Sequence, residues 1–446
     1  MKSPTIEFVN HASVIISYED VSILSDPWFS GTAFHDGWRL MYELQDNEIT
    51  DILKKITHVY ISHEHPDHFR PAFLENKNIK NILIDRKVEF LFQNTVDKRV
   101  VNFLKKNGYK VWELNENEKI NLSDDVQVQI IKYDFYDSAL IIKIPGIKIL
   151  NLNDCPMREE KEINKFRKKH GNFDIVLSQY SYAAWKGGAN NKIYRENAAK
   201  EKLESLERQA TILNCKTLIP FANFVYFSNE LNSYMNDSIN TPEKVINKFL
   251  NKKFDTVILA PKEIQEMSNL KQNQASLDFW KDTINDISLK PKDRYGKSVS
   301  FENLKTECET YNRRILKKNS KFLIFFLHKI KIMHFFQTIN IKLYDHNKSY
   351  NYSIFKGLVE SKYLEPDVSM HSQSLAFIFK NEFGFDTLTV NGCFESSKKN
   401  FSKFVKTFGI GTLNATGLSF SLGLLAEPQI IFTFFKRLKN VIKKLI

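Results

Sequence analysis

The sequence predicts an α/β protein in which two mostly β layers pack between outer helices, an αββα sandwich, followed by a C-terminal α+β domain. Strand and helix patterns alternate from residue 1 to residue 271, and the composition changes after that point. A compact cluster of histidine and aspartate directly follows one short apolar strand. With 42% hydrophobic and 13% aromatic residues in 446, the chain can bury the cores of two or three domains.

The first half of the sandwich is predicted from alternating apolar residues and helical periodicity. Residues 5–26 are typical of an antiparallel hairpin, because apolar residues alternate on both sides of a break at Glu19-Asp20. The patterns that follow predict a helix at 46–55, a buried strand at 57–61, a helix beginning at 70–74, a strand at 81–85, an amphipathic helix at 88–106 and a strand at 109–114.

The second half repeats the same alternation. Strands are expected at 126–133, 139–144 and 147–152, and Pro145-Gly146 forms the tight turn between the last two. Further patterns predict a strand at 173–179, a helix at 196–214, a strand at 216–221, a helix at 242–251 and a strand at 254–259. The sandwich is therefore complete near residue 265.

The cluster after the 57–61 strand has the composition of a metal site. His63, His65, Asp67 and His68 fall within six positions on the loop that leaves the strand's C-terminal end, where α/β folds place their ligands. Neutral imidazole and carboxylate suit zinc, iron or manganese. The alternative is a solvated loop that is rich in histidine. Three histidines in six positions, from 11 in the chain, favour the metal site.

The same cluster is large enough for one or two ions. His63 and His65, two residues apart, can converge on one ion, while Asp67 and His68 turn toward a second. Asp154 ends the 147–152 strand, so its carboxylate is expected at the same edge. It could instead cap a helix that begins near Pro156.

Two further residues close strands near this edge. His11 ends the first strand of the hairpin and Asp26 follows the last, so both can face the metal loop and orient its ligands. The alternative for each is a capped strand end.

The motif of residues 63–68 resembles the signature of the metallo-β-lactamase superfamily. Residues 10–15 and 25–28 are similar to the first hairpin of its lactonase and phospholipase-D branch. Residues 26–38, 151–155, 220–224 and 364–368 resemble the CMP-N-acetylneuraminate hydroxylase family more narrowly. The resemblance implies a metal-dependent enzyme in which Asp154 bridges two ions.

The chain departs from the superfamily pattern in two ligands. The region expected to supply a further histidine contains Asp134 and Asp137 instead, and Ala222 stands where the lactonase branch has another histidine. Either aspartate could replace the first missing ligand. A shell richer in oxygen favours iron or manganese over zinc, and favours one ion over two.

The hydroxylase family also carries a Rieske iron–sulfur domain, which needs two Cys-His pairs. No cysteine of this sequence has a histidine two or three residues after it. An oxygenase reaction would therefore need electrons from a separate reductase.

The loop at 180–189 is aromatic and glycine-rich, a composition that often forms a pocket wall. Lys186 and Arg195 could hold a phosphate or carboxylate there, or could be cations of a solvated loop.

The composition changes after residue 271. A polar stretch at 272–297 is expected to be a linker, and residues 298–446 an α+β domain in which 384–392 resembles a sterol-carrier-like lipid pocket. The basic, apolar stretches at 313–331 and 429–446 are too short to span a bilayer but could lie on an anionic membrane surface. Alternatively, they are helices that cover the domain core.

Four widely spaced cysteines and no apolar leader favour a cytoplasmic protein, with the inner membrane face as the alternative site. The net charge of +12 favours anionic ligands, and no nucleic-acid module accompanies it.

Three functions remain open. The first is a metal-dependent hydrolase of a small anionic substrate, for which the resemblance suggests a sugar nucleotide or glycan intermediate. The metal would lower the pKa of bound water, Asp67 would orient the hydroxide and pass on its proton, and His68 would complete the catalytic pair. The second is an iron-dependent oxygenase, and the third is a non-catalytic lipid- or membrane-binding protein.

Overall fold

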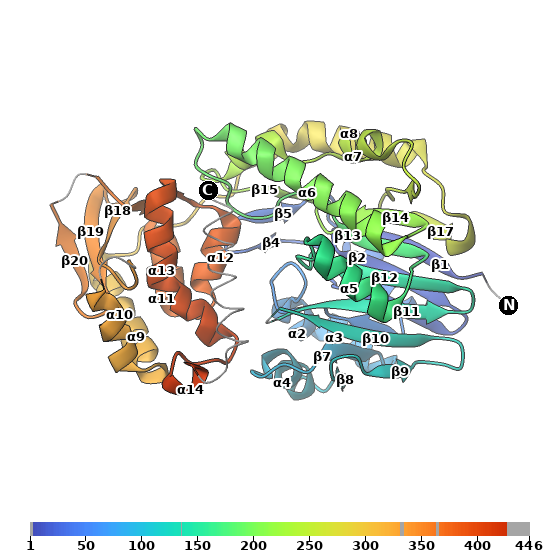
Figure 1. Cartoon of the computed structure of the whole chain (residues 1–446), viewed down its shortest axis with the longest axis horizontal. Helices are drawn as coiled ribbons and strands as arrows, with labels where there is room; N and C mark the ends of the chain where they lie inside the picture. Colours follow the sequence, from blue (N-terminus) through green and yellow to red (C-terminus); the bar gives the residue numbers. More distant parts are fainter. Residues whose placement is uncertain (1–2, 135, 331–333, 363–364, 426–446) are drawn as a thin grey trace.

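The computed structural model describes residues 3–134, 136–330, 334–362 and 365–425. Figure 1 shows a layered N-terminal sandwich with a smaller C-terminal part beside it. The predicted αββα fold with a C-terminal α+β part is confirmed.

The first sheet has, within the described residues, seven strands in the order β17, β1, β2, β3, β6, β7, β8. Their bounds are β1 (Thr5–Asn10), β2 (Ser13–Tyr18), β3 (Val21–Ser25), β6 (His58–Tyr60), β7 (Glu89–Gln93), β8 (Lys110–Leu114) and β17 (Ile264–Glu266). The strands from β3 to β8 run parallel. The outer face packs against α1 (Asp46–Lys55), α2 (Pro71–Glu75), α3 (Lys77–Asp85) and α4 (Arg99–Lys106).

The second sheet also has seven described strands, in the order β16, β14, β13, β12, β11, β10, β9. Their bounds are β9 (Lys119–Asn121), β10 (Gln127–Tyr133), β11 (Asp137–Ile144), β12 (Ile147–Asn153), β13 (Ile175–Gln179), β14 (Thr217–Phe221) and β16 (Asp255–Thr256). Helices α5 (Glu160–His170) and α6 (Lys192–Leu213) cover it (Figure 1). A small sheet of β4 (Thr32–Ala33), β5 (Trp38–Leu40) and β15 (Val225–Phe227) lies beside the sandwich.

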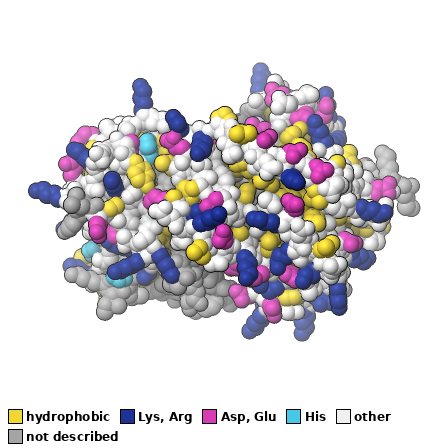
Figure 2. Space-filling model, turned by 90° about the horizontal axis from the view of Figure 1, so that it is seen from above, with side chains coloured by type: hydrophobic (Ala, Val, Ile, Leu, Met, Phe, Trp, Pro, Cys, Tyr) yellow, Lys and Arg dark blue, Asp and Glu magenta, His cyan; other side chains and the backbone are white. Residues whose placement is uncertain are grey.

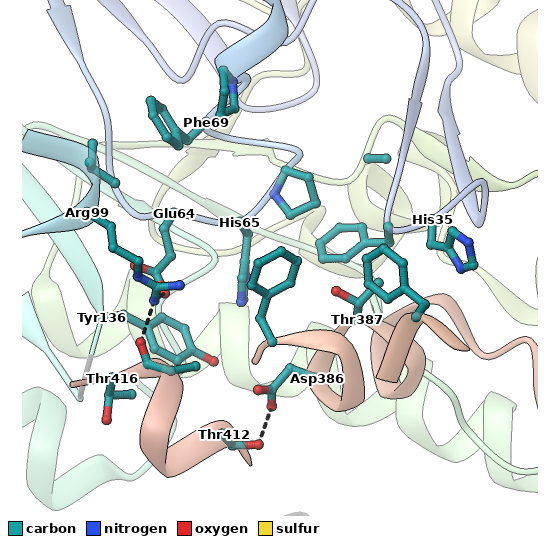
Figure 3. Close-up of a pocket in the computed structure, with 18 of the residues that line it drawn as sticks. His35, Glu64, His65, Phe69, Arg99, Tyr136, Asp386, Thr387, Thr412 and Thr416 are labelled. Carbon is teal, nitrogen blue, oxygen red and sulfur yellow. Dashed lines mark hydrogen bonds and ion pairs between the residues drawn. The ribbon is translucent and has the colours of Figure 1, made fainter. Parts of the chain in front are cut away.

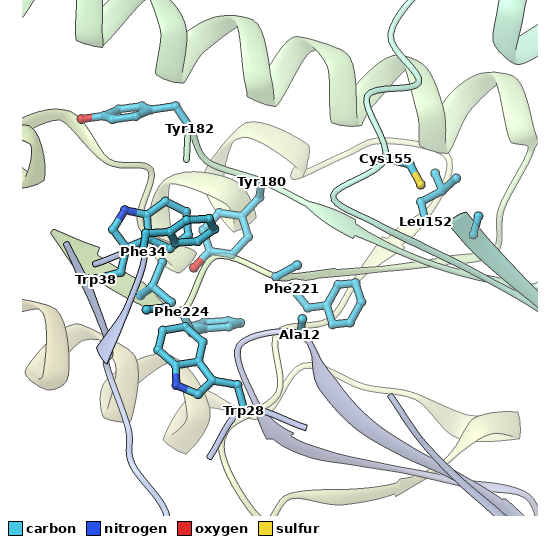
Figure 4. Close-up of a cluster of buried hydrophobic side chains, with 14 of the residues drawn as sticks. Ala12, Trp28, Phe34, Trp38, Leu152, Cys155, Tyr180, Tyr182, Phe221 and Phe224 are labelled. Atoms are coloured by element: carbon cyan, nitrogen blue, oxygen red, sulfur yellow. The ribbon is translucent and has the colours of Figure 1, made fainter. Parts of the chain in front are cut away.

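The alternation along the strands accounts for the two layers of core. In β2, Val14 and Ile16 belong to the core between the sheets, whereas Ile15 belongs to the core under α1–α4. Successive strand residues point to opposite faces, so a strand that is buried on both sides contributes side chains to both cores. Figure 4 shows the aromatic end of the inner core, where Phe34 packs against Trp38 and Tyr180 packs against Phe224.

Two expected elements of the first half are wrong in type. Residues 81–85, predicted as a strand, are the last turns of α3, and residues 88–106, predicted as one helix, form β7 and then α4. Both are short apolar runs, for which periodicity alone does not separate helix from strand.

The stretch at 272–297 also differs from the expected linker. It follows α7 (Pro242–Phe249) and contains α8 (Gln274–Asn285), whose Trp280 is fully buried and stacks on Phe224 at 4.0 Å between ring centroids. This segment therefore adds to the core of the sandwich.

The C-terminal part is built around a sheet of five described strands in the order β20, β19, β18, β21, β22. Its elements are α9 (Phe301–Lys318), α10 (Lys321–Lys329), β18 (Ile339–Leu343), β19 (Lys348–Ser353), β20 (Gly357–Ser361), β21 (Val368–Met370), α11 (Ser372–Lys380), α12 (Gly384–Asn391), β22 (Phe394–Ser396), α13 (Lys398–Ala415) and α14 (Leu422–Leu425). The segment at 384–392, compared above with a lipid pocket, is α12 and its C-cap.

Of the two basic stretches, the first lies almost entirely within the described residues. Residues 313–330 form the end of α9 and then α10, where Phe322, Phe325 and Phe326 are exposed. The stretch at 429–446 lies outside the described residues. Among the described helices, none combines the length and apolarity that crossing a bilayer requires. Peripheral membrane contact stays a prediction.

The excess of positive charge is spread out on the face seen in Figure 2. Lys and Arg side chains are scattered there among Asp and Glu side chains and apolar atoms. On this face the net charge of +12 does not gather into one basic patch.

Candidate metal centre

The histidine loop leaves the C-terminal end of β6, between the neighbouring parallel strands β3 and β7. A turn closes it, because the backbone N–H groups of His68 and Phe69 donate to the carbonyl of His65 at 3.0 and 2.8 Å. This turn directs His63, Asp67 and His68 inward, where all three side chains are buried.

Asp154 meets this loop from the second sheet, directly after β12. Its Oδ2 atom lies 3.8 Å from Nε2 of His63 and 3.8 Å from Nε2 of His68. The structure thus brings together the two histidines and the aspartate that the sequence placed at one edge, and their ligand atoms could hold a metal ion.

His11 forms a second group with Asp67 and His68. Its Nε2 atom is 3.3 Å from Oδ2 of Asp67, and Nε2 of His68 is 3.1 Å from the same oxygen. The sequence suggested that His11 orients other ligands, but these atoms lie close enough for His11 to bind an ion itself. The backbone N–H of Ala222 donates to the His11 carbonyl at 2.7 Å, so His11 adjoins the position that lacks a histidine.

Of the two aspartates offered as a replacement ligand, only Asp137 faces the cluster. Asp137 begins β11, and its Oδ1 atom is 4.0 Å from Nε2 of His63. Asp134 lies in the turn of the same hairpin with a φ of 55°, and it is exposed. Because the hairpin register pairs Tyr133 with Asp137, Asp137 belongs to the strand while Asp134 lies in the turn.

His65 sits at the outer side of the cluster. Its Nδ1 atom is 2.8 Å from Nε2 of His63, and its ring packs edge-on against Tyr136 and Phe34.

A buried network holds the ligands in place. Asp26 is fully buried, accepts a hydrogen bond from the backbone N–H of Ser62 at 2.7 Å and lies 3.2 Å from Nδ1 of His68. The side-chain amide of Asn153 donates to Asp26 and, at 2.7 Å, to the Ser62 hydroxyl. That hydroxyl is 2.9 Å from Nδ1 of His63. Asp26 therefore contacts the histidine loop, and its role in orienting metal ligands stays a prediction. Ser62 and Asn153 were not singled out in the sequence.

The electrostatics of the cluster depend on burial and on neighbouring charges. Burial alone would raise the pKa of Asp67, but His68 and the hydrogen bond with His11 hold it well below its usual range. Burial likewise opposes a charge on His68, yet the carboxylates of Asp67 and Asp26 raise its pKa well above normal. Burial, with help from His63, lowers the pKa of His65 to about 3.

The residues fit a bound metal. Oδ1 of Asp67 and Oδ1 of Asp154 are buried and make no hydrogen bond within the described part of the chain. Burial and the nearby Asp154 carboxylate raise the pKa of Asp137 well above its usual range. A divalent cation would supply the missing partner of each oxygen and remove the repulsion between the two carboxylates.

Comparison with known proteins agrees with this geometry. Residues 5–179 match the family model described as a β-lactamase superfamily domain. The chain is also 25% identical over 250 residues to the cytidine monophosphate-N-acetylneuraminic acid hydroxylase of Danio rerio and 23% identical over 280 residues to that of Xenopus laevis. These matches cover 52% and 58% of this chain but only 40% and 44% of the relatives, so it spans less than half of their length.

Solved structures give a weaker similarity. CmlA, a diiron β-hydroxylase from Streptomyces venezuelae, is 15% identical with a TM-score of 0.42, over 60% of this chain and 54% of that one. Igni18, a metallo hydrolase from Ignicoccus hospitalis, is 13% identical with a TM-score of 0.39, over 59% and 98%. Similarity at TM-scores below 0.5 says nothing about activity.

A mostly apolar cavity of about 450 Å³ lies between the N-terminal sandwich and the C-terminal part, and His65 and Tyr136 line it. Aromatic side chains from both parts form much of its wall, namely Phe34, Phe69, Phe103, Phe377 and Phe383. Figure 3 shows His65 directed into this space, opposite Asp386 of α12.

A second cavity, of about 370 Å³, reaches the cluster from Asp154. Lys186, named from the sequence, lines it together with Arg158 and Lys202, which were not. The three cations are far apart in the sequence, and only the folding of α6 against the 180–186 loop brings them together.

Arg195 is not brought to either cavity. Its guanidinium is 1% exposed, pairs with Asp237 at 2.6 and 2.8 Å, and donates to the carbonyls of Gly188 and Ala189 at 2.8 and 3.2 Å. Arg195 therefore fastens the glycine-rich loop.

Proposed function

We propose that this chain is a metal-dependent hydroxylase with a dinuclear iron centre that acts on a small anionic substrate. One ion would be held by His63, His65 and Asp137, the other by His11, Asp67 and His68, and Asp154 would bridge them. The observation that carries this proposal is Asp137, a carboxylate 4.0 Å from Nε2 of His63 where the superfamily pattern calls for a histidine.

The ligand chemistry supports iron. Each proposed ion has two imidazoles and two carboxylates, counting Asp154 for both, and oxygen-rich sets favour iron or manganese over zinc. The curated relatives are hydroxylases by name, which agrees with an oxidative reaction.

Iron would supply the binding and activation of O₂. Hydroxylation replaces a C–H bond by C–OH with one oxygen atom of O₂, and the second atom leaves as water after two electrons and two protons are added. No Cys-His pair of the kind that holds a Rieske cluster occurs in these 446 residues, so in this proposal the electrons come from a donor outside them.

The chain's own residues have defined parts in this proposal. Asp26 and Ser62 orient His68 and His63 by hydrogen bonds. His65 and Tyr136 form the boundary between the cluster and the interdomain cavity.

Hydrolysis is the second candidate, and the free oxygen of Asp67 favours it. Oδ1 of Asp67 is buried without a hydrogen bond in the described residues, so it could orient a metal-bound water and accept its proton. His68, which lies 3.1 Å from the other oxygen, would hold Asp67 in that orientation.

Metal analysis after anaerobic purification separates these functions. Iron at about two equivalents, with O₂ uptake when a reductant is added, is the result expected for the hydroxylase. Zinc or manganese without O₂ uptake favours the hydrolase, and a protein that retains no metal contradicts both. Asp67→Ala is the control, because it should lower the metal content while the circular dichroism spectrum stays that of the parent.

A further inference from the structure

The cavity beside Asp154 has a wall of cations. Arg158 follows β12, Lys186 comes from the loop after β13, and Lys202 lies on α6, so three separate elements deliver them to one space of about 370 Å³. The pocket also contains Tyr182 and Gln179, and its charged lining consists of these three cations with Glu201 and Asp154.

These cations are weakly compensated. The ammonium of Lys202 donates to the uncharged side chain of Gln179, and that of Lys186 donates to the carbonyl of Trp185 at 3.4 Å. Neither lysine has an ion pair within 4.0 Å in the described part of the chain. Among the residues that the structure describes, the acidic partner of Arg158 is Glu201, at 3.9 Å, and that carboxylate is 56% exposed.

The carboxylate of Asp154 does not fully neutralise the positive charge of these three side chains. Its Oδ2 atom lies 3.8 Å from His63 and from His68, which are among the residues proposed to hold metal. We therefore assign its negative charge to the metal centre. The three cations against Glu201 and Asp154 leave the lining with a net charge of +1, and with Asp154 assigned to the proposed metal centre the remaining charge is +2, the complement of a dianion.

The surroundings of the two lysines in the folded protein disfavour their positive charge. Burial and then the neighbouring Arg158 lower the pKa of Lys186 to about 8, and the same two causes lower the pKa of Lys202 well below its usual range. Cations that repel one another in a partly buried pocket are stabilised by an anion that binds between them.

We propose that this pocket binds the phosphate group of the substrate, with Arg158, Lys186 and Lys202 as its donors. The inference rests on the proposed function and extends it, because it assigns the residues of this chain that would bind a phosphate group beside the proposed metal centre. A phosphate dianion matches the net charge of +2, and a guanidinium with two ammonium groups provides donors for its oxygens. Asp154 lines the same pocket, so the phosphate lies next to the metal centre.

The test is binding of inorganic phosphate to the metal-loaded full chain by isothermal titration calorimetry, with acetate as the monoanionic comparison. We expect phosphate to bind more tightly than acetate. Lys202→Met and Lys186→Met should each weaken phosphate binding by about tenfold or more, because each removes a charged donor. Lys200→Met is the matched control, since Lys200 lies exposed on the same helix outside the pocket, and it should bind phosphate like the parent.

The metal content is measured for every variant. Phosphate affinity that is equal in Lys202→Met, Lys186→Met and the parent would overturn the inference, since phosphate would then bind the metal directly or elsewhere. Equal affinity for acetate and phosphate would overturn it as well. Failure of the proposed function shows itself differently, as absence of iron or of O₂ uptake in a protein whose pocket variants still lose phosphate.

Discussion

Asp137 is the residue-scale feature on which the proposed metal chemistry depends, because it lies 4.0 Å from His63 where the superfamily pattern has a histidine. Because this carboxylate faces His63 while Asp134 points to solvent, the two aspartates of one hairpin provide a direct comparison.

We expect Asp137→Ala to weaken metal binding by roughly tenfold or more, and Asp134→Ala to leave it unchanged. Metal titration monitored by calorimetry, with the metal content checked by elemental analysis, measures both. Equal affinities in the two variants would mean that water or another group completes the ligands of His63.

Asp386 is a second residue with a predictable effect, this time on stability. It lies on α12 beside the interdomain cavity and accepts a hydrogen bond from Thr412 at 3.0 Å. Burial raises the pKa of its carboxyl to about 7, well above the value near 4 expected in the unfolded chain. Between these two values the folded state holds a proton that the unfolded state releases, so this group's contribution to stability falls as the pH rises from about 4 to 7.

Asp386→Asn removes this titration. Relative to the parent, the variant should be more stable by about 1–3 kcal/mol at pH 8 and nearly unchanged at pH 4. Urea unfolding at both pH values measures the difference. A variant that gains as much stability at pH 4 as at pH 8 would contradict the argument, because the gain could not come from ionisation.

At the scale of elements, an ion pair between Arg195 and Asp237 helps to hold the glycine-rich loop between β13 and α6. Arg195, almost fully buried, joins the loop carbonyls to Asp237 of the 3₁₀ helix η1 (Ser233–Ser238), and its guanidinium lies 5.0 Å from the ring centroid of Tyr234. Loss of one partner leaves buried acceptors without a donor.

Arg195→Met should lower the free energy of unfolding by about 2–4 kcal/mol, below the full effect of a buried pair because Asp237 is partly exposed. Lys192→Met is the matched control on the same helix: its pair with Glu196 is exposed, so a change below about 1 kcal/mol is expected. Urea unfolding gives both values. Loss of metal from Arg195→Met without loss of stability would instead place Arg195 in the site.

The elements also show what the sequence could predict. The candidate metal loop could be proposed because His63, His65, Asp67 and His68 are close in the sequence, and most strands and helices could be predicted from their periodicity. Residues 81–85 were misassigned because Ile82 and Leu83 fit a strand as well as the last turn of a helix. Lys202 gave no signal, because it is one of many charged residues on a helix, and only the tertiary fold directs it to the pocket.

At the scale of the whole molecule, the C-terminal part completes the interdomain cavity. The turn at 34–37 reaches it from between β4 and β5: the amide of Asn391 donates to the carbonyl of Phe34 at 3.1 Å, and the ring of His35 stacks on Phe377 at 4.3 Å between centroids. Asn232 donates to the Asn391 carbonyl at 2.6 Å and to that of Gly37 at 2.8 Å. A cavity with walls from both parts exists only while these contacts hold the two parts together.

Gly37 is the point at which this contact can be tested. A Cβ atom there would overlap the Cβ of Asn391 and would lie 3.1 Å from its Cα, so any side chain at residue 37 pushes the two parts of the molecule apart. Gly37→Ala should therefore lower the free energy of unfolding by about 1–3 kcal/mol and expose the interface to limited proteolysis.

The proposed metal ligands all belong to the N-terminal sandwich, so the metal content of Gly37→Ala should equal that of the parent. Gly296→Ala is the control, because a Cβ at residue 296 meets nothing within 4 Å and its φ is not in the left-handed region. If Gly37→Ala were as stable and as protease-resistant as Gly296→Ala, the close approach of the two parts at Asn391 would not be needed to hold the cavity closed. If it lost metal, the centre itself would depend on the C-terminal part.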